Sequence, residues 1–158
     1  MVGHVGRFTY AKNHNFLLDI FSEFSIKKEN AILLLVGDGE LHQAIVNKVK
    51  EKGIEKKVVF IGRVSVLKLC YLLADVIVIL SIFEGLSLVT IESQVADVPS
   101  VVSEPIPEEA VISNGVKRLK LSDDNRADEV IEIADNKVVL NENSKDYNRK
   151  YTVRKLQN

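Results

Sequence analysis

Two uninterrupted runs of apolar residues, each followed by a turn that contains glycine, constrain the fold of this chain more than any other feature. Residues 31–36 (Ala-Ile-Leu-Leu-Leu-Val) lead into Gly37-Asp38-Gly39, and residues 76–80 (Val-Ile-Val-Ile-Leu) lead into Ser81 to Gly85. Successive side chains of a strand point to opposite faces, so a strand that is apolar at every position needs cover on both faces. The two runs therefore predict buried strands of a parallel sheet.

The order of strand, turn and helix recurs along most of the sequence. Apolar spacing predicts strands at residues 2–6, 31–36, 57–61, 75–80, 100–103 and 116–121. It predicts helices at about 14–24, 40–52, 65–73, 87–96, 126–134 and 141–158, with Asn13 and Ser65 as N-caps and Gly53 as a stop. Repeated strand-helix-strand units build a parallel sheet. The predicted fold class is α/β, a Rossmann-like parallel sheet with helices on both faces.

The bulk properties of the chain exclude several classes of protein. Its 158 residues suit one α/β domain, and its formal net charge of −1 gives no electrostatic reason to expect a nucleic-acid partner. The single cysteine, Cys70, excludes an internal disulfide and has the apolar neighbours of a buried residue. No apolar stretch is long enough to span a bilayer, and residues 2–7 do not read as a signal peptide. The abrupt start in a strand predicts a domain of a longer protein.

The turns after the strands carry groups that suit phosphates and hydroxyls. In a parallel sheet these turns meet at one edge, which is where ligands bind in open α/β folds. Glycine allows close approach of backbone N–H groups, and Arg7 and Lys12 add the positive charge that a diphosphate requires. Glu84 and Glu92 are acceptors for the hydroxyls of a sugar or a ribose. The combination predicts a nucleotide-sugar site.

The sequence argues against two other kinds of phosphate site. The first predicted strand is not followed by Gly-x-Gly-x-x-Gly, which argues against a dinucleotide cofactor. Gly-x-x-x-x-Gly-Lys-Ser/Thr is also missing, which argues against a P-loop ATPase or kinase. No cluster of metal-ligating residues stands out in the sequence.

Four motifs, in order along residues 2–121, resemble a known family. They are Val5-Gly6-Arg7-Phe8 with Lys12-Asn13-His14, the segment 35–41 (Leu-Val-Gly-Asp-Gly-Glu-Leu), the segment 59–62 (Val-Phe-Ile-Gly), and Phe83-Glu84-Gly85-Leu86 with Glu92. Together they look like the C-terminal, donor-binding domain of GT-B glycosyltransferases. The motifs are most similar to those of the retaining group 1, family 4 class that builds bacterial capsular, exopolysaccharide and lipopolysaccharide chains. Glu84 and Glu92 match its pair of glutamates eight residues apart.

The resemblance implies a role for each matching residue. Arg7 and Lys12 would stabilise the departing nucleoside diphosphate, Glu84 would bind hydroxyls of the transferred sugar, and these three form the implied catalytic set. Glu92 would bind the ribose hydroxyls. The remaining implied donor-binding residues are Gly6, Gly37, Gly85, the backbone of Leu86, Ser87 and Leu88 near the phosphates, and Arg63 and Val64 beside the base.

The family also implies an activity, a donor and partners. Residues 1–158 would be the donor-binding domain of a hexosyltransferase that uses a nucleoside-diphosphate sugar, with UDP expected, and a saccharide or lipid-linked acceptor in surface polysaccharide synthesis. The reaction would retain the anomeric configuration without a metal or other cofactor. The N-terminal acceptor-binding domain would be missing, so we expect this chain to be inactive alone. A cytoplasmic location is expected, with room for peripheral association of the full-length enzyme with the inner face of the membrane.

Several of these residues also have plainer structural interpretations, and the sequence departs from the family at one position. Lys12 and Glu92 also suit solvated surface positions, Asp38 suits a helix cap, and the histidines at 4, 14 and 42 suit packing, a helix start and the surface. The family has a glycine where this chain has Asp97, in Ala96-Asp97-Val98-Pro99, and Asp is less tolerant of a positive φ. The alternative functions are a different enzyme of the same fold and a non-catalytic or regulatory interaction domain.

Overall fold

A computed structural model describes residues 1–63, 67–122 and 126–135. Three sequence predictions therefore lie outside the described residues: the base contact of Val64, the N-cap at Ser65 and the terminal helix at 141–158. None of the described helices is both long enough and apolar enough to cross a membrane.

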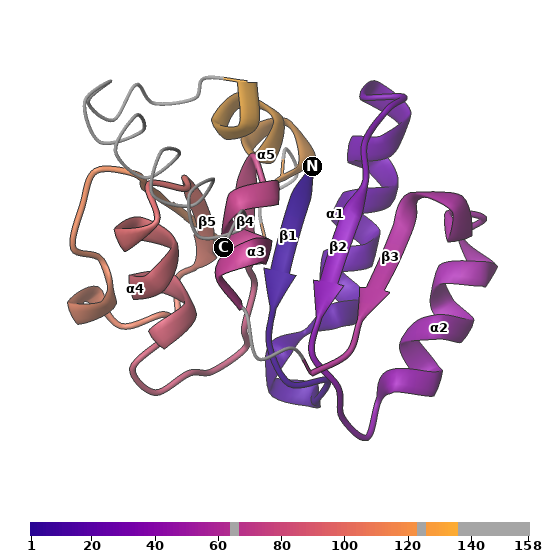
Figure 1. The fold of residues 1–158 in the computed structure, drawn as a ribbon, viewed down its shortest axis with the longest axis horizontal. Helices are drawn as coiled ribbons and strands as arrows, with labels where there is room; N and C mark the ends of the chain where they lie inside the picture. The colour runs from indigo at the N-terminus through magenta and orange to yellow at the C-terminus, as the bar shows by residue number, and fades with distance from the viewer. Residues whose placement is uncertain (64–66, 123–125, 136–158) are drawn as a thin grey trace, which may run out of the picture.

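The described strands form one parallel sheet of six, in the order β3-β2-β1-β4-β5-β6. Their bounds are Val2–Val5 (β1), Leu33–Val36 (β2), Val58–Ile61 (β3), Val76–Ile79 (β4), Ser100–Ser103 (β5) and Val116–Leu119 (β6). The strands run the same way, and β1, β2 and β3 end at the bottom of Figure 1. The predicted fold class is confirmed, as are all six predicted strands, although several are a residue or two shorter than expected.

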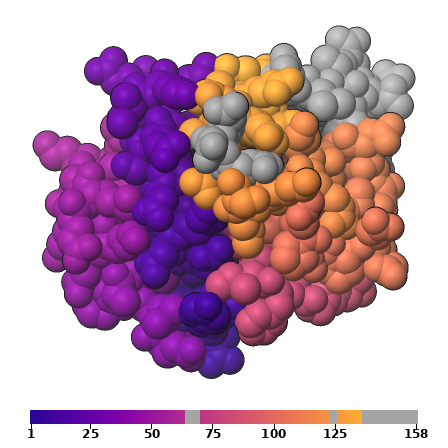
Figure 2. Space-filling view, turned by 180° about the vertical axis from the view of Figure 1, so that it is seen from behind, coloured from indigo at the N-terminus to yellow at the C-terminus, as the bar shows by residue number. Residues whose placement is uncertain are grey.

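Helices cover both faces of the sheet, as the all-apolar strands require. The helices are α1 (His14–Lys27), α2 (His42–Glu51), α3 (Leu67–Leu73), α4 (Leu88–Val95) and α5 (Arg126–Asp135), with short 3₁₀ turns η1 (Tyr10–Lys12), η2 (Glu55–Lys57) and η3 (Glu108–Ala110). One apolar cluster joins α1, α2 and α5 to the sheet, and a second joins α3, α4 and η3 to its other face. Figure 2 shows α1 and α5 side by side on the back of the molecule.

The buried strands supply most of the core. Leu33, Leu35, Val76 and Val78 point into the cluster under α1 and α5, while the alternate residues of the same strands point into the other cluster. All four residues of β2 and of β4 are buried. Cys70 is also buried within the second cluster, as predicted, and burial raises the pKa of its thiol.

Two predicted helix caps need correction. Asn13 does precede α1, but its backbone is left-handed (φ 54°) and its side chain makes no capping hydrogen bond. A capping side chain normally comes from a residue with extended backbone, which this φ excludes. The Asp38 carboxylate instead accepts a hydrogen bond from the adjacent Gly39 N–H at 2.8 Å, and Leu41 precedes α2. The predicted stop at Gly53 is confirmed by its positive φ of 65°.

Asp97 occupies the left-handed region of backbone conformation, which favours glycine. Its φ is 57°, just after α4, and every side chain except that of glycine is strained there to a degree that depends on its shape. We expect Asp97→Val to be about 1–2 kcal/mol less stable than Asp97→Gly, since a β-branched side chain crowds the backbone most in this region. Urea unfolding measures both. Equal stability of the two variants would contradict the assignment.

Candidate functional site

The candidate site lies where the strand order reverses. Along the sheet β1 stands between β2 and β4, so the chain runs outward in one direction from β1 to β3 and in the other from β4 to β6. Such a switch point leaves a crevice between the turns that follow the two neighbouring strands. Here these turns are residues 6–13 after β1 and 80–87 after β4. A hydrogen bond from Ile82 N–H to the Ala11 carbonyl joins them at 2.9 Å.

Lys12 and Glu84 meet at this switch point. The Lys12 ammonium donates to both carboxylate oxygens of Glu84, at 2.6 and 2.7 Å. Their side chains are 18% and 14% exposed, so the ion pair is largely shielded from water but still open on one side. Ser81 donates a further hydrogen bond of 2.7 Å to Glu84 Oε2, and its own carbonyl accepts one from the Ser103 hydroxyl at 2.6 Å. The Glu84 carboxylate is thus held by groups from both turns, and Ser103 steadies the second of them.

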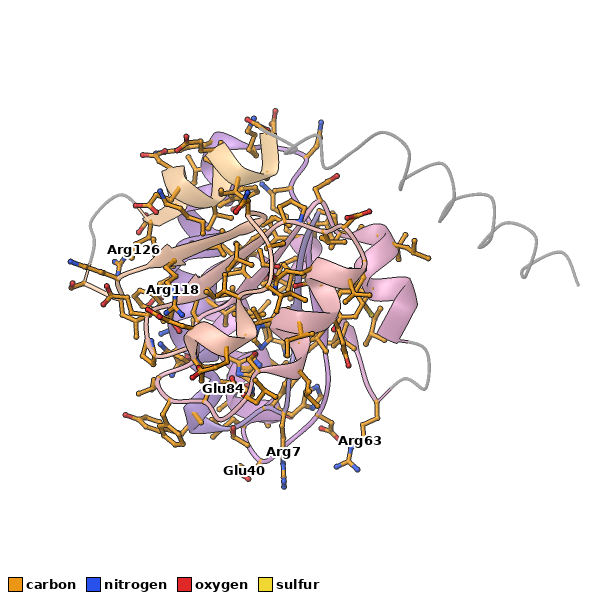
Figure 3. The ribbon with its side chains drawn as sticks, turned by 90° about the vertical axis from the view of Figure 1, so that its left-hand side faces the viewer. Arg7, Glu40, Arg63, Glu84, Arg118 and Arg126 are labelled. Carbon is orange, nitrogen blue, oxygen red and sulfur yellow. The ribbon has the colours of Figure 1, made fainter. Side chains whose placement is uncertain are left out.

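A cleft of about 460 Å³ opens beside this pair, over the ends of β1, β2 and β3. It is lined by Val5, Gly6, Arg7, Val36, Gly37, Asp38, Gly62 and Arg63. Both arginines are exposed, and Figure 3 shows them extending from the same end of the molecule, away from Arg118 and Arg126. Two exposed arginines therefore border a cleft that three glycines also line. Such an arrangement can bind an anion such as a diphosphate.

The glycines of the turns fall into two groups. A methyl group at Gly37, which has φ 139°, would lie 2.0 Å from the Gly6 carbonyl oxygen, and one at Gly39 would lie 2.5 Å from the Phe8 carbonyl oxygen. These two residues are glycine because the β1 turn passes directly over them. A methyl group at Gly62 or Gly85 would meet nothing within 4 Å, and neither residue has a positive φ, so folding does not demand glycine there. Open space beside a glycine backbone is suited to a ligand.

Glu92 is bonded to a different partner from those of Glu84. It is exposed on α4, and its Oε2 accepts a hydrogen bond of 2.6 Å from the Tyr71 hydroxyl of α3. Leu86, on the turn before α4, and Leu88, the first residue of α4, are exposed. Ser87 between them is buried and accepts a hydrogen bond from the Thr90 hydroxyl at 2.8 Å. The first N–H groups of a helix have no partner within the helix, so this turn can offer donors to a ligand.

Two histidines are buried directly under the site. His4 and His14 are 0% and 2% exposed, and their rings meet edge to face with centroids 4.7 Å apart. His4 Nδ1 donates to the Val78 carbonyl at 2.8 Å, while its Nε2 and both nitrogens of His14 have no partner among the described residues. Burial, outweighing every other influence, lowers the pKa of His4 to about 4 and that of His14 to about 3. Both rings are therefore neutral near pH 7, and they are packed as predicted for His4.

Apart from residues 85–88, at the start of α4, the described predicted residues fall into three groups. Arg7, Gly6, Gly37 and Arg63 share the cleft, Lys12 and Glu84 form an ion pair beside it, and Glu92 is held by α3. Sequence reasoning missed two residues, Tyr71 and Ser81. Tyr71 is concealed in the apolar pattern of its helix, whereas Ser81 could have been found as the first polar residue after β4. In the described ranges no three His, Cys, Asp or Glu side chains gather closely enough to hold a metal ion.

Comparison with known sequences gives one consistent family. Residues 1–152 match the family described as Glycosyl transferases group 1. EpsF of Bacillus subtilis, which is named as a putative glycosyltransferase, is 33% identical over 124 residues, covering 78% of this chain and 32% of EpsF. The amylovoran biosynthesis glycosyltransferase AmsD of Erwinia amylovora is 34% identical over 97 residues, covering 61% of this chain and 27% of AmsD. The chain spans about a third or less of the length of these relatives.

Solved structures share the fold. TarM of S. aureus, determined with UDP among its ligands, has a TM-score of 0.79 at 22% identity over 87% of this chain and 29% of TarM. HepE of Anabaena in complex with UDP has a TM-score of 0.69 at 20% identity, over 85% of this chain and 37% of HepE. The C-terminal domain of the group 1 protein LpcC from Francisella tularensis has a TM-score of 0.75 at 17% identity, over 85% of this chain and 75% of that domain.

Proposed function

Because this chain belongs to the group 1 glycosyltransferases, we propose that it is the donor-binding domain of a retaining hexosyltransferase of surface polysaccharide synthesis. Its ligand is a nucleoside-diphosphate sugar, with UDP as the expected nucleotide. The observation that carries the proposal is the meeting of Lys12 and Glu84 at the switch point of the sheet, next to a cleft bordered by Arg7 and Arg63. One site then offers cations for phosphate and a carboxylate for hydroxyls.

The chemistry of the departing group explains why cations are needed. Transfer of the sugar leaves negative charge on the nucleoside diphosphate, and fixed positive groups lower the energy of that charge most where water is excluded. In this proposal Arg7 and Lys12 take the diphosphate, with backbone N–H groups of the segment Gly85 to Leu88 as further donors. No metal or other cofactor is part of the proposed reaction. The anomeric configuration is retained.

The Lys12–Glu84 pair gives the site a defined resting state. Without a donor, each charge satisfies the other, which avoids the penalty of a shielded charge without a partner. A bound nucleotide-sugar offers phosphate oxygens to Lys12 and hydroxyl donors to Glu84, so each group exchanges its partner in the free site for one on the donor. Ser81 keeps Glu84 in place during the exchange because its hydrogen bond to Oε2 does not involve Lys12.

A second domain completes the proposed enzyme. Three large apolar side chains beside the site are exposed, Phe83 at 63%, Leu86 at 57% and Leu88 at 62%. Their place at the rim of the crevice suits contact with the acceptor-binding N-terminal half, and the length of the relatives leaves room for it. We expect this chain alone to bind the donor without transferring the sugar. The proposed enzyme works in the cytoplasm, at the inner face of the membrane when its acceptor is lipid-linked, and has no nucleic-acid partner.

The proposed function predicts that Arg7 controls nucleotide affinity. We expect titration calorimetry to show binding of UDP or GDP, and Arg7→Ala to weaken that binding about tenfold or more, because a charge-assisted hydrogen bond to phosphate contributes about 1.5–3 kcal/mol. Lys50→Ala, which removes a cation exposed on α2, serves as the control and should bind as the wild type does. If neither diphosphate binds at millimolar concentration, the donor-site assignment is wrong.

A further inference from the structure

The hydrogen bond between Tyr71 and Glu92 joins two helices, α3 and α4, that follow different strands of the sheet. Tyr71 lies in α3, which follows the turn that contains Arg63, and Glu92 lies in α4, which follows the turn that contains Glu84. The Tyr71 side chain is buried, with 5% of the residue exposed, and packs in the apolar cluster with Cys70 and Ile77, while its hydroxyl reaches Glu92 Oε2 at 2.6 Å. A buried ring therefore presents its one polar atom to an exposed carboxylate.

The geometry leaves half of the Glu92 carboxylate available. A carboxylate has two oxygens that can each accept hydrogen bonds. Tyr71 takes Oε2, and across the described ranges no residue donates to Oε1. Burial first, and then the bond to Glu92, raise the pKa of Tyr71 above its ordinary value of 10.0, so the hydroxyl stays a donor at neutral pH. The direction of the hydrogen bond is therefore fixed.

We propose that Tyr71 is a positioning residue, whose hydroxyl holds the Glu92 carboxylate so that its other oxygen accepts a hydrogen bond from a ribose hydroxyl of the donor nucleotide. This inference rests on the proposed function, because it assumes a nucleotide at the site. An exposed glutamate on a helix surface samples several rotamers, and fixing such a side chain on binding costs affinity. A side chain that is already held in the free protein avoids this cost.

The inference predicts a loss of affinity that depends on the ribose. Tyr71→Phe keeps the buried ring and removes the hydroxyl alone. We expect titration calorimetry of this 158-residue chain to show a roughly three- to tenfold weaker affinity for UDP in Tyr71→Phe. Affinity for inorganic pyrophosphate, which has no ribose, should not change. In a chain that already carries Glu92→Ala, the further change Tyr71→Phe should leave UDP affinity unaltered, because the hydroxyl acts through that carboxylate.

The controls separate positioning from stability. Ser25→Ala removes a different buried hydroxyl, which bonds to the Ser22 carbonyl at 2.9 Å on α1, and should bind both ligands as the wild type does. Thermal unfolding verifies that Tyr71→Phe is folded at the temperature of the titration. Equal weakening of UDP and pyrophosphate by Tyr71→Phe, an unchanged UDP affinity, or additive effects of Tyr71→Phe and Glu92→Ala would each overturn the role of Tyr71. A wild-type chain that binds no nucleoside diphosphate would instead overturn the proposed function, and the role of Tyr71 with it.

Discussion

Replacing Gly37 by alanine is expected to destabilise the chain by about 3–5 kcal/mol, a large part of the stability of a domain of this size. Two independent causes act together. The added methyl group would lie 2.0 Å from the Gly6 carbonyl oxygen, and the backbone φ of 139° is one that only glycine adopts without strain. The Gly6 carbonyl cannot move easily, since its turn is tied down by the hydrogen bond from Phe8 N–H to the Asp38 carbonyl at 2.9 Å.

Urea unfolding of matched glycine variants tests this expectation. Gly62→Ala lies at the corresponding position after the next strand, where nothing stands within 4 Å of the added methyl group and φ is not positive. We expect its stability to stay within about 0.5 kcal/mol of the wild type. If Gly37→Ala and Gly62→Ala lose similar stability, the close passage of the β1 turn over Gly37 is not the reason for this glycine.

The core of the fold could be predicted from the sequence because its signal is local. Residues 33–36 and 76–79 are apolar at every position, a pattern that indicates a strand covered on both faces. Both runs are buried strands in the structure. Strand ends were less well predicted. Ala31 and Ile32 continue the apolar pattern of β2 but precede its pairing with β1, which begins at Leu33 opposite Val2. The apolar pattern indicates which residues are buried, whereas the bounds of a strand depend on where the neighbouring strand pairs with it.

The site could be predicted only as a set of turns. Parallel topology brings the residues after each strand to one edge, so the placement of Arg7, Arg63 and Glu84 near that edge followed from their order along the chain. The direct pairing of Lys12 with Glu84 did not, since it depends on contact between residues 72 positions apart. Nor could the sequence separate Gly37, which folding requires, from Gly62, which has open space around it. Both occupy the same place in the strand-turn-helix pattern.

Acid is expected to destabilise this chain from about pH 6.5 downward, because two buried histidines take up protons less readily in the folded protein than in the unfolded chain. The folded protein keeps His4 and His14 neutral, with pKa values lowered by burial to about 4 and about 3, whereas both titrate near 6.5 in the unfolded chain. Below pH 6.5 the unfolded state therefore binds more protons than the folded state, and stability falls as the pH falls. The stabilising effect of the neutral rings is fully present above pH 6.5 and is lost progressively as the pH falls toward 4 and then 3.

The expected loss between pH 7 and pH 5 is on the order of 3 kcal/mol for the two rings together, as each contributes up to about 1.4 kcal/mol per pH unit in this window. Urea midpoints measured at intervals from about pH 7.5 to 5 determine the slope. His14→Phe should remove about half of it, because phenylalanine can keep the edge-to-face contacts with His4 and Phe8 and cannot be protonated. A midpoint independent of pH, or a full slope in His14→Phe, would show that the buried pair under the Lys12–Glu84 site does not govern the response to acid.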